Sequence, residues 1–490
     1  MMLTFLLACP LVGMLIILAL PKSAVQTIRN TALLSTGGAL FLSLMLLSHF
    51  QPQLTGVQFQ EHVLWIPQLH IYYHLGLDGI NLPMVLLTTL LGFLACFASW
   101  SIKERHKEYY ALYLLLQVGM LGTFLALDLF LFYVFWEVVL VPMYFLIGIW
   151  GGGRREYSAF KFFVYTLAGS LFMLLGILAL YLHPNGQTFD MLELAQKGPA
   201  FPLAFQRWLF LAFFLGFAIK VPIFPFHTWL PDAHVDAPTP GSVLLAGVLL
   251  KMGGYGFFRI AYPIFPAAAQ WFGGTMAVLG MINIVYGAFV AMAQTDFKRL
   301  VAYSSVSHMG FVLLGLSSLT PEGMNGAMLQ MFSHGIITGA MFLLVGVLYD
   351  RTHTRDLNAF GGLGVQMPVY GGLLIFFSLA SLGLPGLSGF VAEFLSLVGT
   401  FGVWRWQTVV SVLGIVVAAA YMLKVIRQIL LGPLNEKWRA LPDATLREVC
   451  SLVPLLLLTV AVGVYPLLVL QLQDGALRQL VAHVLGHPLP

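Results

Sequence analysis

The sequence predicts an all-α, polytopic membrane protein with about 14 transmembrane helices. Of the 490 residues, 59% are hydrophobic and only 9% are charged, whereas about 25% of the residues of a soluble domain are charged. Apolar runs of roughly 20 residues, each long enough to cross about 30 Å of hydrocarbon, recur along the chain. The polar-leaning stretches 50–80, 183–207 and 432–447 are too short to form a core of their own, so no soluble domain is expected.

The apolar runs define fourteen predicted spans. In chain order they are 3–20, 31–49, 80–100, 110–126, 129–150, 160–182, 208–229, 241–260, 272–293, 298–317, 323–349, 368–398, 408–430 and 447–470. The first run has neither a basic n-region nor a small-residue cleavage site, so it predicts a spanning helix rather than a signal peptide. The seventh and twelfth runs contain internal breaks.

The basic residues predict which side of the membrane each loop faces, because cytoplasmic loops carry more Lys and Arg. With the N-terminus outside, five of the 24 Lys and Arg residues fall on the outer side: Lys197, Arg207, Arg259, Arg405 and Arg478. Three lie within predicted spans, and the rest fall in inner loops. This bias predicts an even number of helices in the bacterial cytoplasmic (inner) membrane, with both termini on the outer, periplasmic side. The net charge of +4 then reflects loop positions, and no nucleic-acid partner is expected.

A series of ionisable residues lies within the predicted spans. A charge at mid-bilayer costs at least about 3 kcal/mol, so each such residue is a functional candidate by default. They are Glu137, Lys220, His227, Lys251, His308, His334, Glu393 and Lys424. About one such group occurs per central span, which predicts a chain of proton-exchanging sites rather than one compact catalytic site.

Lys220 lies in "FAIKVPIFPFHTWLPDAH", where a helix break is encoded beside it. Proline has no N–H, so Pro222 leaves the carbonyl of Ala218 without a helical partner. Pro225 does the same to the carbonyl of Val221. Irregular backbone at membrane depth is tolerated only where it faces protein or a wet cavity, so the break predicts a hydrated interior. The alternative is a proline kink used for packing, with the lysine reaching the surface.

Glu137, deep in the fifth span, is a candidate carboxylate partner for Lys220. Pairing favours the charged form of both groups, whereas burial favours the neutral lysine. A lysine that is subject to both effects can bind a proton and release it when its partner moves. The alternative for Glu137 is a neutral, hydrogen-bonded acid with a structural role. Lys251 lies ten residues into the eighth span, and the glycines that follow it allow close helix approach and leave space for water.

His308 and His334 lie in the tenth and eleventh spans. A lone histidine in an apolar span is usually a satisfied core group, but hydroxyl side chains flank both of these. They are Ser304, Ser305, Ser307, Ser333 and Thr338. Histidine titrates near neutral pH, so the group predicts a polar path suited to a proton relay. No carboxylate or thiol lies at ligand spacing, so no metal site is predicted.

The twelfth span, "SLASLGLPGLSGFVAEFLSL", has Pro385 among glycines and is followed by Glu393, so it is a second broken helix with a buried charge. Two broken helices five spans apart predict inverted repeats with ion sites at the breaks. The predicted segments are 1–105 (three N-terminal helices), 106–262 (first five-helix repeat, helices 4–8), 263–432 (second repeat, helices 9–13) and 433–490 (last helix and tail). Lys424 is a candidate counterpart of Lys251, and its role stays open.

The stretches that carry these features resemble a known family. "FWEVVLVPMYFLIGIWGG", "KVPIFPFHTWLPDAHVDAPTPGSVLLAGVLLKMGGYG", "DFKRLVAYSSVSHMGFVLLG" and "LPGLSGFVAEF" resemble the antiporter-like subunits of proton-pumping NADH:quinone oxidoreductase, respiratory complex I (NDH-1). The similarity covers essentially residues 80–430. Within the family, "YDRTHTRDLNAFGGL" and the glutamate of "LPGLSGFVAEF" are similar to the subunit M type, the counterpart of mitochondrial subunit 4. The subunit L type is longer, with a lateral C-terminal helix.

The resemblance implies an antiporter-like fold and proton translocation from the cytoplasm to the outside, driven by quinone reduction elsewhere in the complex. The implied relay residues are Glu137 and Lys220 (the input ion pair), Lys251 (the central relay), His308 and His334 (its continuation) and Glu393 (the terminal site toward the outside). The implied partners are the lipid bilayer and the other membrane subunits of complex I, especially the other two antiporter-like subunits.

The implied enzyme is a proton-translocating NADH:quinone oxidoreductase, with no redox centre in this chain. NADH, FMN, the iron–sulfur clusters and quinone would all be bound by other subunits, so no cofactor is expected here. The three cysteines agree with this, because Cys9, Cys96 and Cys450 are far apart in sequence and form no CxxC pattern for an iron–sulfur or zinc site.

Two relatives of the family stay open as alternatives. One is the large subunit of a multisubunit Na+/H+ antiporter, which resembles spans 4–13 but tends to have lysine at the position of Glu393. The other is a subunit of a membrane-bound hydrogenase. A non-pumping membrane scaffold is a different class, and the buried ionisable groups argue against it because a scaffold has no use for their insertion cost. The chains that co-purify with this one would separate these functions.

Overall fold

A computed structural model describes residues 1–54 and 56–486 of the protein. The described chain is mostly helical, which confirms the predicted fold class. It forms two compact units. Unit 1 comprises Met1–Pro222, Val248–Gly273 and Gln471–Pro490, and unit 2 comprises Ile223–Gly247 and Gly274–Leu470. The division into an N-terminal segment, two repeats and a tail stays a prediction.

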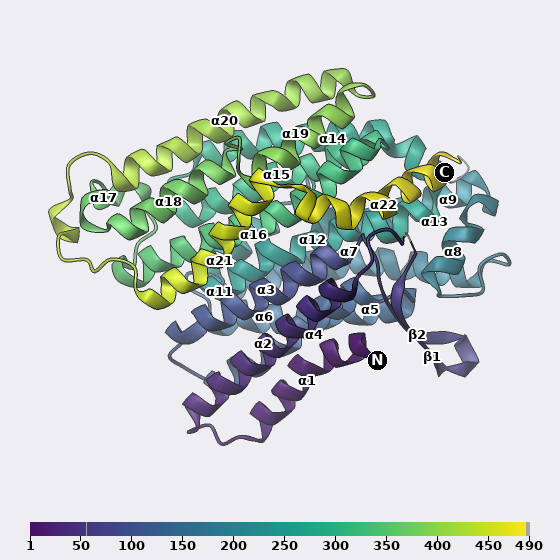
Figure 1. Cartoon of the computed structure of the whole chain (residues 1–490), viewed down its shortest axis with the longest axis horizontal. Helices are drawn as coiled ribbons and strands as arrows, with labels where there is room; N and C mark the ends of the chain where they lie inside the picture. The colour runs from purple at the N-terminus through teal and green to yellow at the C-terminus, as the bar shows by residue number, and fades with distance from the viewer. Residues whose placement is uncertain (55, 487–490) are drawn as a thin grey trace. The chain divides into compact units, whose positions relative to one another are not determined.

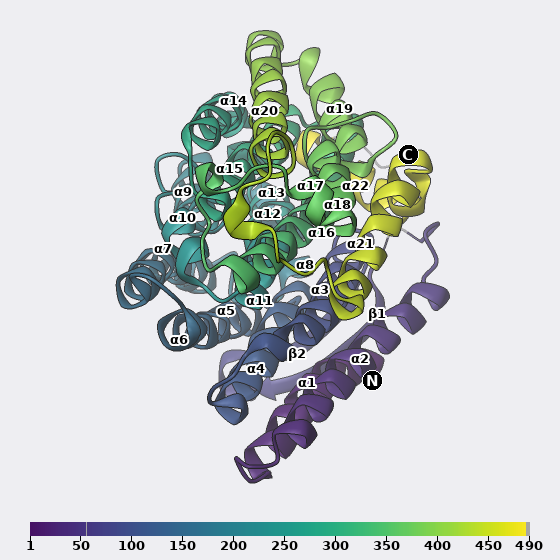
Figure 2. The ribbon, with the colours of Figure 1, turned by 90° about the vertical axis from the view of Figure 1, so that its left-hand side faces the viewer.

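Unit 1 contains the N-terminal helices, in which α1, α2 and α4 pack against one another (Figures 1 and 2). Its elements are α1 (Met2–Ala19), α2 (Val25–His49), β1 (Gln58–Ile66), β2 (Ile71–Leu77), α3 (Leu82–Ala98), α4 (His106–Leu125), α5 (Leu129–Val138), α6 (Leu140–Trp150), α7 (Arg155–Leu182), α8 (Met191–Lys197), α9 (Leu203–Lys220), α12 (Leu250–Gly256), α13 (Tyr262–Ile264) and most of α22 (Leu467–Leu485).

Unit 2 is built around α15, α16 and α19, which contact one another pairwise. Its elements are α10 (Trp229–Asp236), α11 (Thr239–Leu244), most of α14 (Pro266–Ala293), α15 (Phe297–Ser318), α16 (Pro321–Thr352), α17 (Leu363–Gln366), α18 (Pro368–Ser381), α19 (Ser388–Phe401), α20 (Arg405–Leu430) and α21 (Leu446–Val464). Almost every side chain of α15 and α16 is buried, so these two helices form the core of the unit.

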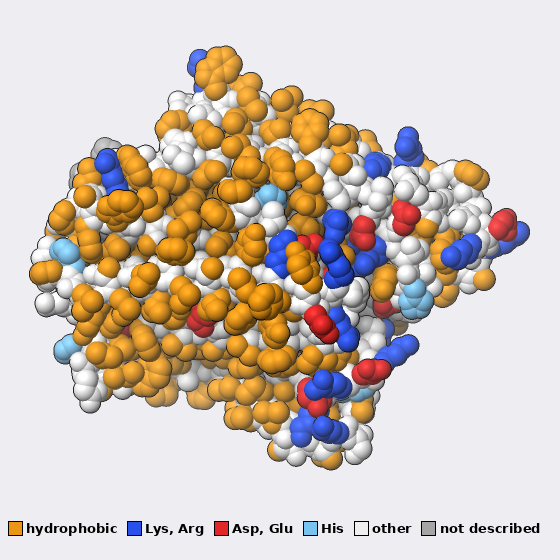
Figure 3. Space-filling view, turned by 180° about the vertical axis from the view of Figure 1, so that it is seen from behind, with side chains coloured by type: hydrophobic (Ala, Val, Ile, Leu, Met, Phe, Trp, Pro, Cys, Tyr) orange, Lys and Arg blue, Asp and Glu red, His pale blue; other side chains and the backbone are white. Residues whose placement is uncertain are grey.

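The helices are long and apolar enough for a multi-pass membrane protein. Within the described residues, twelve helices have the length and composition to cross a membrane, and the shorter apolar helices α18 and α19 lie at the twelfth predicted span. The α4 helix occupies the fourth predicted span. Large apolar side chains such as Leu34, Leu175 and Val416 are exposed, and Figure 3 shows hydrophobic side chains over much of one face, with charged ones gathered to one side. The chain is a multi-pass membrane protein, and the count of fourteen spans stays a prediction.

Both predicted helix breaks are present. The α9 helix ends at Lys220, and α10 begins only at Trp229, after the segment that holds both prolines. The α18 helix ends at Ser381 and α19 begins at Ser388. Between them Gly383 has a φ of +81° and Gly386 a φ of +91°, a left-handed conformation that glycine adopts without steric cost. Local sequence therefore set both breaks.

The stretch 50–80, expected to be a connecting loop, contains a β-hairpin. Strands β1 and β2 pair antiparallel, with His62 opposite His74 and Leu64 opposite Tyr72. The hairpin contacts the connection between the sixth and seventh predicted spans: His74 Nδ1 lies 2.6 Å from Asp190 Oδ2. Both segments are predicted to face the same side of the membrane. Four predicted spans separate these two residues, so their contact supports an even number of crossings between them. Which side is the outer one stays a prediction.

Candidate proton-transfer sites

Lys220 is the last residue of α9 and is only 1% exposed. Its Nζ lies 5.2 Å from the ring centre of Trp136 on α5 and 5.7 Å from that of Phe162 on α7. The Nζ atom has no hydrogen-bond partner in the part of the chain that the structure describes. Two aromatic faces therefore lie within cation–π range of the ammonium group, and no hydrogen bond fixes it in its charged form.

Glu137 lies on α5, next in sequence to Trp136, and interacts electrostatically with Lys220. Tyr133 and Ser170 neighbour its carboxyl group, and Oε1 has no hydrogen-bond partner among the described residues. The predicted pair thus interacts through space, without a direct hydrogen bond. Since Glu137 is only partly buried in the isolated chain, a small movement of α5 or of a neighbouring chain would change its attraction for Lys220.

Lys251 lies on α12 and is completely buried. As predicted, a glycine allows a close helix approach beside it: a Cβ at Gly253 would lie 2.8 Å from the carbonyl oxygen of Phe217 and 3.0 Å from the N atom of Val221. The helix with Lys251 therefore packs directly on the end of α9, where Lys220 lies. Two π-helical turns, Leu245–Leu249 and Phe257–Ala261, flank α12, and such bulges often occur at functional sites.

His308 on α15 and Glu393 on α19 are in direct contact, although 85 residues separate them. His308 Nδ1 lies 3.0 Å from Glu393 Oε1, and Nε2 lies 3.3 Å from Oγ of Ser381, the last residue of α18. All three side chains are buried. A neutral imidazole has one donor and one acceptor nitrogen, so His308 can take a proton at one nitrogen and release one at the other.

The helix break at α18–α19 shapes this site. A Cβ at Gly383 would lie 2.9 Å from Glu393 Oε2, so the backbone of the break approaches the carboxylate closely. A cavity of about 10 Å³ is lined by His308, His334, Ser381 and Glu393, among other residues. This is about the space that one water molecule needs. The ring of His334 lies 5.7 Å from that of His308, centre to centre, so His308 neighbours both His334 and Glu393.

The two remaining intramembrane candidates differ from the relay residues. Lys424 Nζ donates to the carbonyl oxygens of Met292 (2.9 Å) and Gln294 (3.0 Å), at the C-terminal end of α14. A cation there satisfies helix-end carbonyls and complements the helix dipole, whereas no such contact within the described chain holds Lys220. His227 is buried among aromatic rings, with its ring centre 5.2 Å from that of Tyr286.

Arg259, predicted to lie on the outer side, is buried inside the helical segment Thr239–Ile264, and the side of the membrane that it faces stays a prediction. Its Nη2 lies 2.6 Å from Asp78 Oδ1, and its Nε donates to Oη of Tyr255 at 3.0 Å. Tyr255 Oη in turn donates to the carbonyl oxygen of Phe124. Asp78 and Arg259 are 181 residues apart, so no local signal marked the pair.

We expect replacement of Arg259 with methionine to destabilise unit 1 strongly, because it leaves Asp78 as an unpaired buried carboxylate. Removing one partner of a buried ion pair costs about 3–5 kcal/mol. The measurement is thermal unfolding of the purified chain in detergent. The double variant Asp78→Leu/Arg259→Met should recover part of the loss, since no charge is then left unpaired. Equal stability of the single variant and the wild type would contradict this assignment.

Comparison with known proteins identifies the family. The family described as "NADH:quinone oxidoreductase/Mrp antiporter, TM" matches residues 126–419. NADH-quinone oxidoreductase subunit M of Rhodobacter capsulatus is 46% identical over 471 residues, which cover 94% of this chain and 91% of that protein. The corresponding subunit M of Rickettsia bellii is 42% identical over 465 residues, or 93% of this chain and 94% of that one.

Solved structures agree in fold. A chain of respiratory complex I from Thermus thermophilus with bound NADH is 32% identical, with a TM-score of 0.89, and the match covers 98% of this chain and all of that one. A chain of the Mrp complex from Dietzia sp. has a TM-score of 0.84 at 22% identity, a likeness that shows the fold alone. The chain therefore belongs to the NADH:quinone oxidoreductase/Mrp antiporter family of membrane subunits.

Proposed function

We propose that this chain is a proton-translocating membrane subunit of NADH:quinone oxidoreductase, respiratory complex I. The observation that carries the proposal is the buried contact of His308 with Glu393 and Ser381 beside a water-sized cavity. Protonatable groups buried at membrane depth are costly, and their direct contact beside a cavity is what proton exchange requires. The names of the relatives, subunit M in both, select the complex I branch of the family.

The mechanism starts at the Glu137–Lys220 pair. A perturbation from a neighbouring subunit, driven by quinone reduction, moves Glu137 or neutralises its charge. Burial then favours the neutral amine, and Lys220 releases its proton toward Lys251.

The mechanism ends in unit 2. His308 receives a proton and passes it to Glu393 through the Nδ1–Oε1 contact. The ring of His334 lies 5.7 Å from that of His308, and His308 contacts Glu393 directly, so we assign His334 as a second donor or reservoir to His308. Protonated Glu393 then releases its proton toward the outside, through the break between α18 and α19.

We propose that the partners are the other membrane subunits of the complex, including its two other antiporter-like subunits. The membrane would be the bacterial inner membrane, with both termini on the periplasmic side. NADH, FMN, iron–sulfur clusters and quinone would bind elsewhere in the complex. Proton translocation by this chain would then be coupled to electron transfer without any redox centre of its own.

The experiment is purification of the chain under mild detergent with whatever chains accompany it. The proposal predicts co-purification with a flavin- and iron–sulfur-containing arm that oxidises NADH. Recovery with only small membrane subunits and Na+/H+ exchange activity would overturn it in favour of the antiporter alternative. Recovery with a hydrogenase partner that has metal-dependent H₂ chemistry would overturn the proposal in favour of the membrane-bound hydrogenase alternative.

A further inference from the structure

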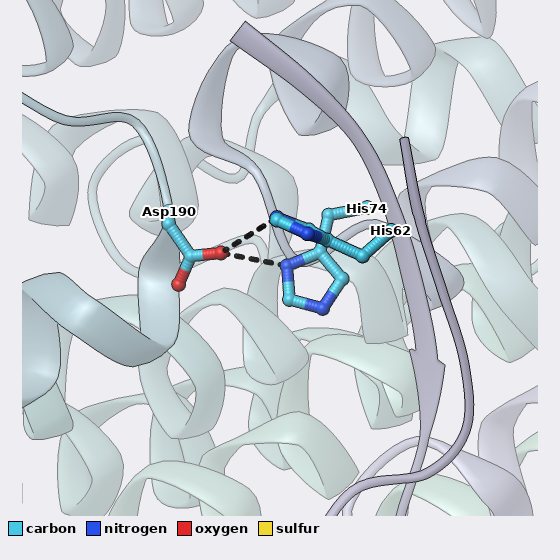
Figure 4. Close-up of side chains that lie close together, drawn as sticks. All are labelled: His62, His74 and Asp190. Carbon is cyan, nitrogen blue, oxygen red and sulfur yellow. Dashed lines mark hydrogen bonds and ion pairs between the residues drawn. The ribbon is translucent and has the colours of Figure 1, made fainter. Parts of the chain in front are cut away.

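Three side chains with metal-binding atoms meet outside the relay, all within unit 1. His62 lies on β1, His74 on β2, and Asp190 immediately before α8 (Figure 4). One ligand atom from each lies within 4.8 Å of the others. None of the three belongs to a predicted span, and the relay does not use them.

We propose that His62, His74 and Asp190 form a binding site for a divalent transition-metal ion of the Zn²⁺ class. Two imidazoles and one carboxylate are a ligand set that Zn²⁺ and its neighbours in the first transition row use, with a water in the fourth position. His62 and His74 are cross-strand partners in the hairpin, so the pairing itself places both rings on one face.

The distances are close to those of a metal site. Ligand atoms about 2.0–2.1 Å from a tetrahedral ion lie about 3.3 Å from one another. Asp190 Oδ2 lies 2.6 Å from His74 Nδ1 and 4.0 Å from His62 Nε2. Binding would therefore lengthen the first distance and shorten the second by about 0.7 Å each. Side-chain rotation can supply movements of this size.

The carboxylate of Asp190 is held in position and has one oxygen to spare. Oδ1 accepts hydrogen bonds from the backbone N–H groups of Leu192 and Glu193, both at 2.9 Å. Oδ2 points toward both histidines (Figure 4). Asp190 therefore offers one carboxylate oxygen from a fixed backbone position.

The surroundings of the two histidines suit one buried and one accessible ligand. His74 is 4% exposed, and in this structure its Nδ1 is hydrogen-bonded to Asp190 Oδ2. Metal binding at Nδ1 would replace that hydrogen bond and leave the neutral ring with its proton on Nε2. The side chain of His62 is 46% exposed, which leaves a path for the ion and its water.

Asp128, a carboxylate that neighbours Asp190, already has hydrogen-bond partners. Asp128 Oδ1 accepts hydrogen bonds from the backbone N–H groups of Phe130 and Leu131, and Oδ2 from that of Tyr72. It therefore caps α5 and is not offered as a ligand. A bound ion would tie the β-hairpin to the connection between α7 and α8, on the side predicted to be the outer one.

The test is Co²⁺ titration of the full chain in detergent, purified without a histidine tag, stripped with a chelator and followed by visible absorption. The chain has 13 histidines, so the signal is the difference between variants. We expect one Co²⁺ per chain, displaced by Zn²⁺. His62→Ala and Asp190→Asn should weaken binding at least about tenfold, which is about 1.4 kcal/mol.

The matched control is His70→Ala, which removes an exposed histidine from the turn of the same hairpin and should bind Co²⁺ like the wild type. Asparagine remains a good helix N-cap, so Asp190→Asn should keep α8 intact, and equal thermal unfolding of all variants verifies this. Wild-type affinity in both His62→Ala and Asp190→Asn would overturn the site. Absence of saturable Co²⁺ binding to the wild type would reduce the cluster to a hydrogen-bonded His–Asp pair.

Discussion

Replacing Lys220 with methionine is expected to reduce NADH-driven proton pumping at least about tenfold while the complex still assembles. Methionine fills a similar volume between Trp136 and Phe162 but cannot carry a proton. A positioned proton-transfer group contributes about 10²–10⁴-fold in rate, so proton pumping should be almost abolished. Stability should not fall, because the ammonium group is buried and has no hydrogen-bond partner among the described residues, and burying a charge is costly.

Lys220→Arg distinguishes a fixed charge from a proton carrier. Arginine stays charged under all conditions in proteins, so it preserves the attraction for Glu137 but cannot release a proton. The proposed relay predicts that Lys220→Arg fails to pump as Lys220→Met does. Pumping is measured in inside-out membrane vesicles, with NADH oxidation by an artificial acceptor as the assembly control. Wild-type pumping by the arginine variant would show that the charge alone matters.

The second large effect is expected for Glu393→Gln, with a loss of coupled activity of at least about tenfold. Glutamine keeps the length of the side chain and can still accept a hydrogen bond from His308, so packing around the cavity should persist. It cannot take up a proton, so His308 loses its acceptor. The measurement is the same vesicle assay, with the amount of assembled complex determined in parallel.

Ser381→Ala is the companion to Glu393→Gln. It removes only the hydroxyl group 3.3 Å from His308 Nε2, so it tests the other side of the imidazole. We expect a smaller reduction, because the cavity of about 10 Å³ leaves a water-sized space that can replace the hydroxyl group. If Ser381→Ala abolished pumping while Glu393→Gln retained it, Glu393 would not be the partner of His308 in proton transfer, contrary to the proposal.

The features that sequence alone predicted are those encoded locally. Pro222 and Pro225 cannot donate to a helix, and α9 ends at Lys220 just before them. The glycines around Pro385 allow the left-handed turns between α18 and α19. Hydrophobic runs likewise predicted the helices, because lipid requires a continuous apolar stretch whatever the partner helices are.

What sequence could not predict depends on contacts between distant segments. The His308–Glu393 contact and the Asp78–Arg259 ion pair each join residues far apart in the chain. The β-hairpin was missed because its strands alternate weakly and lie in a polar-leaning stretch. Without the hairpin, nothing in the sequence related His62 and His74 to Asp190. The role of Lys424 could not be predicted either, since the carbonyl groups that it contacts lie on another helix.

The central claim is that the buried ionisable groups carry protons rather than only stabilise the fold. The most direct measurement is the rate of NADH-driven proton uptake by inside-out vesicles that contain assembled complex with Lys251→Met, beside Lys424→Met as the matched lysine control. Lys424 binds helix-end carbonyls, so its variant should pump at close to the wild-type rate. Lys251→Met should pump at least about tenfold more slowly. Wild-type pumping by Lys251→Met, at wild-type levels of assembled complex, would contradict the account.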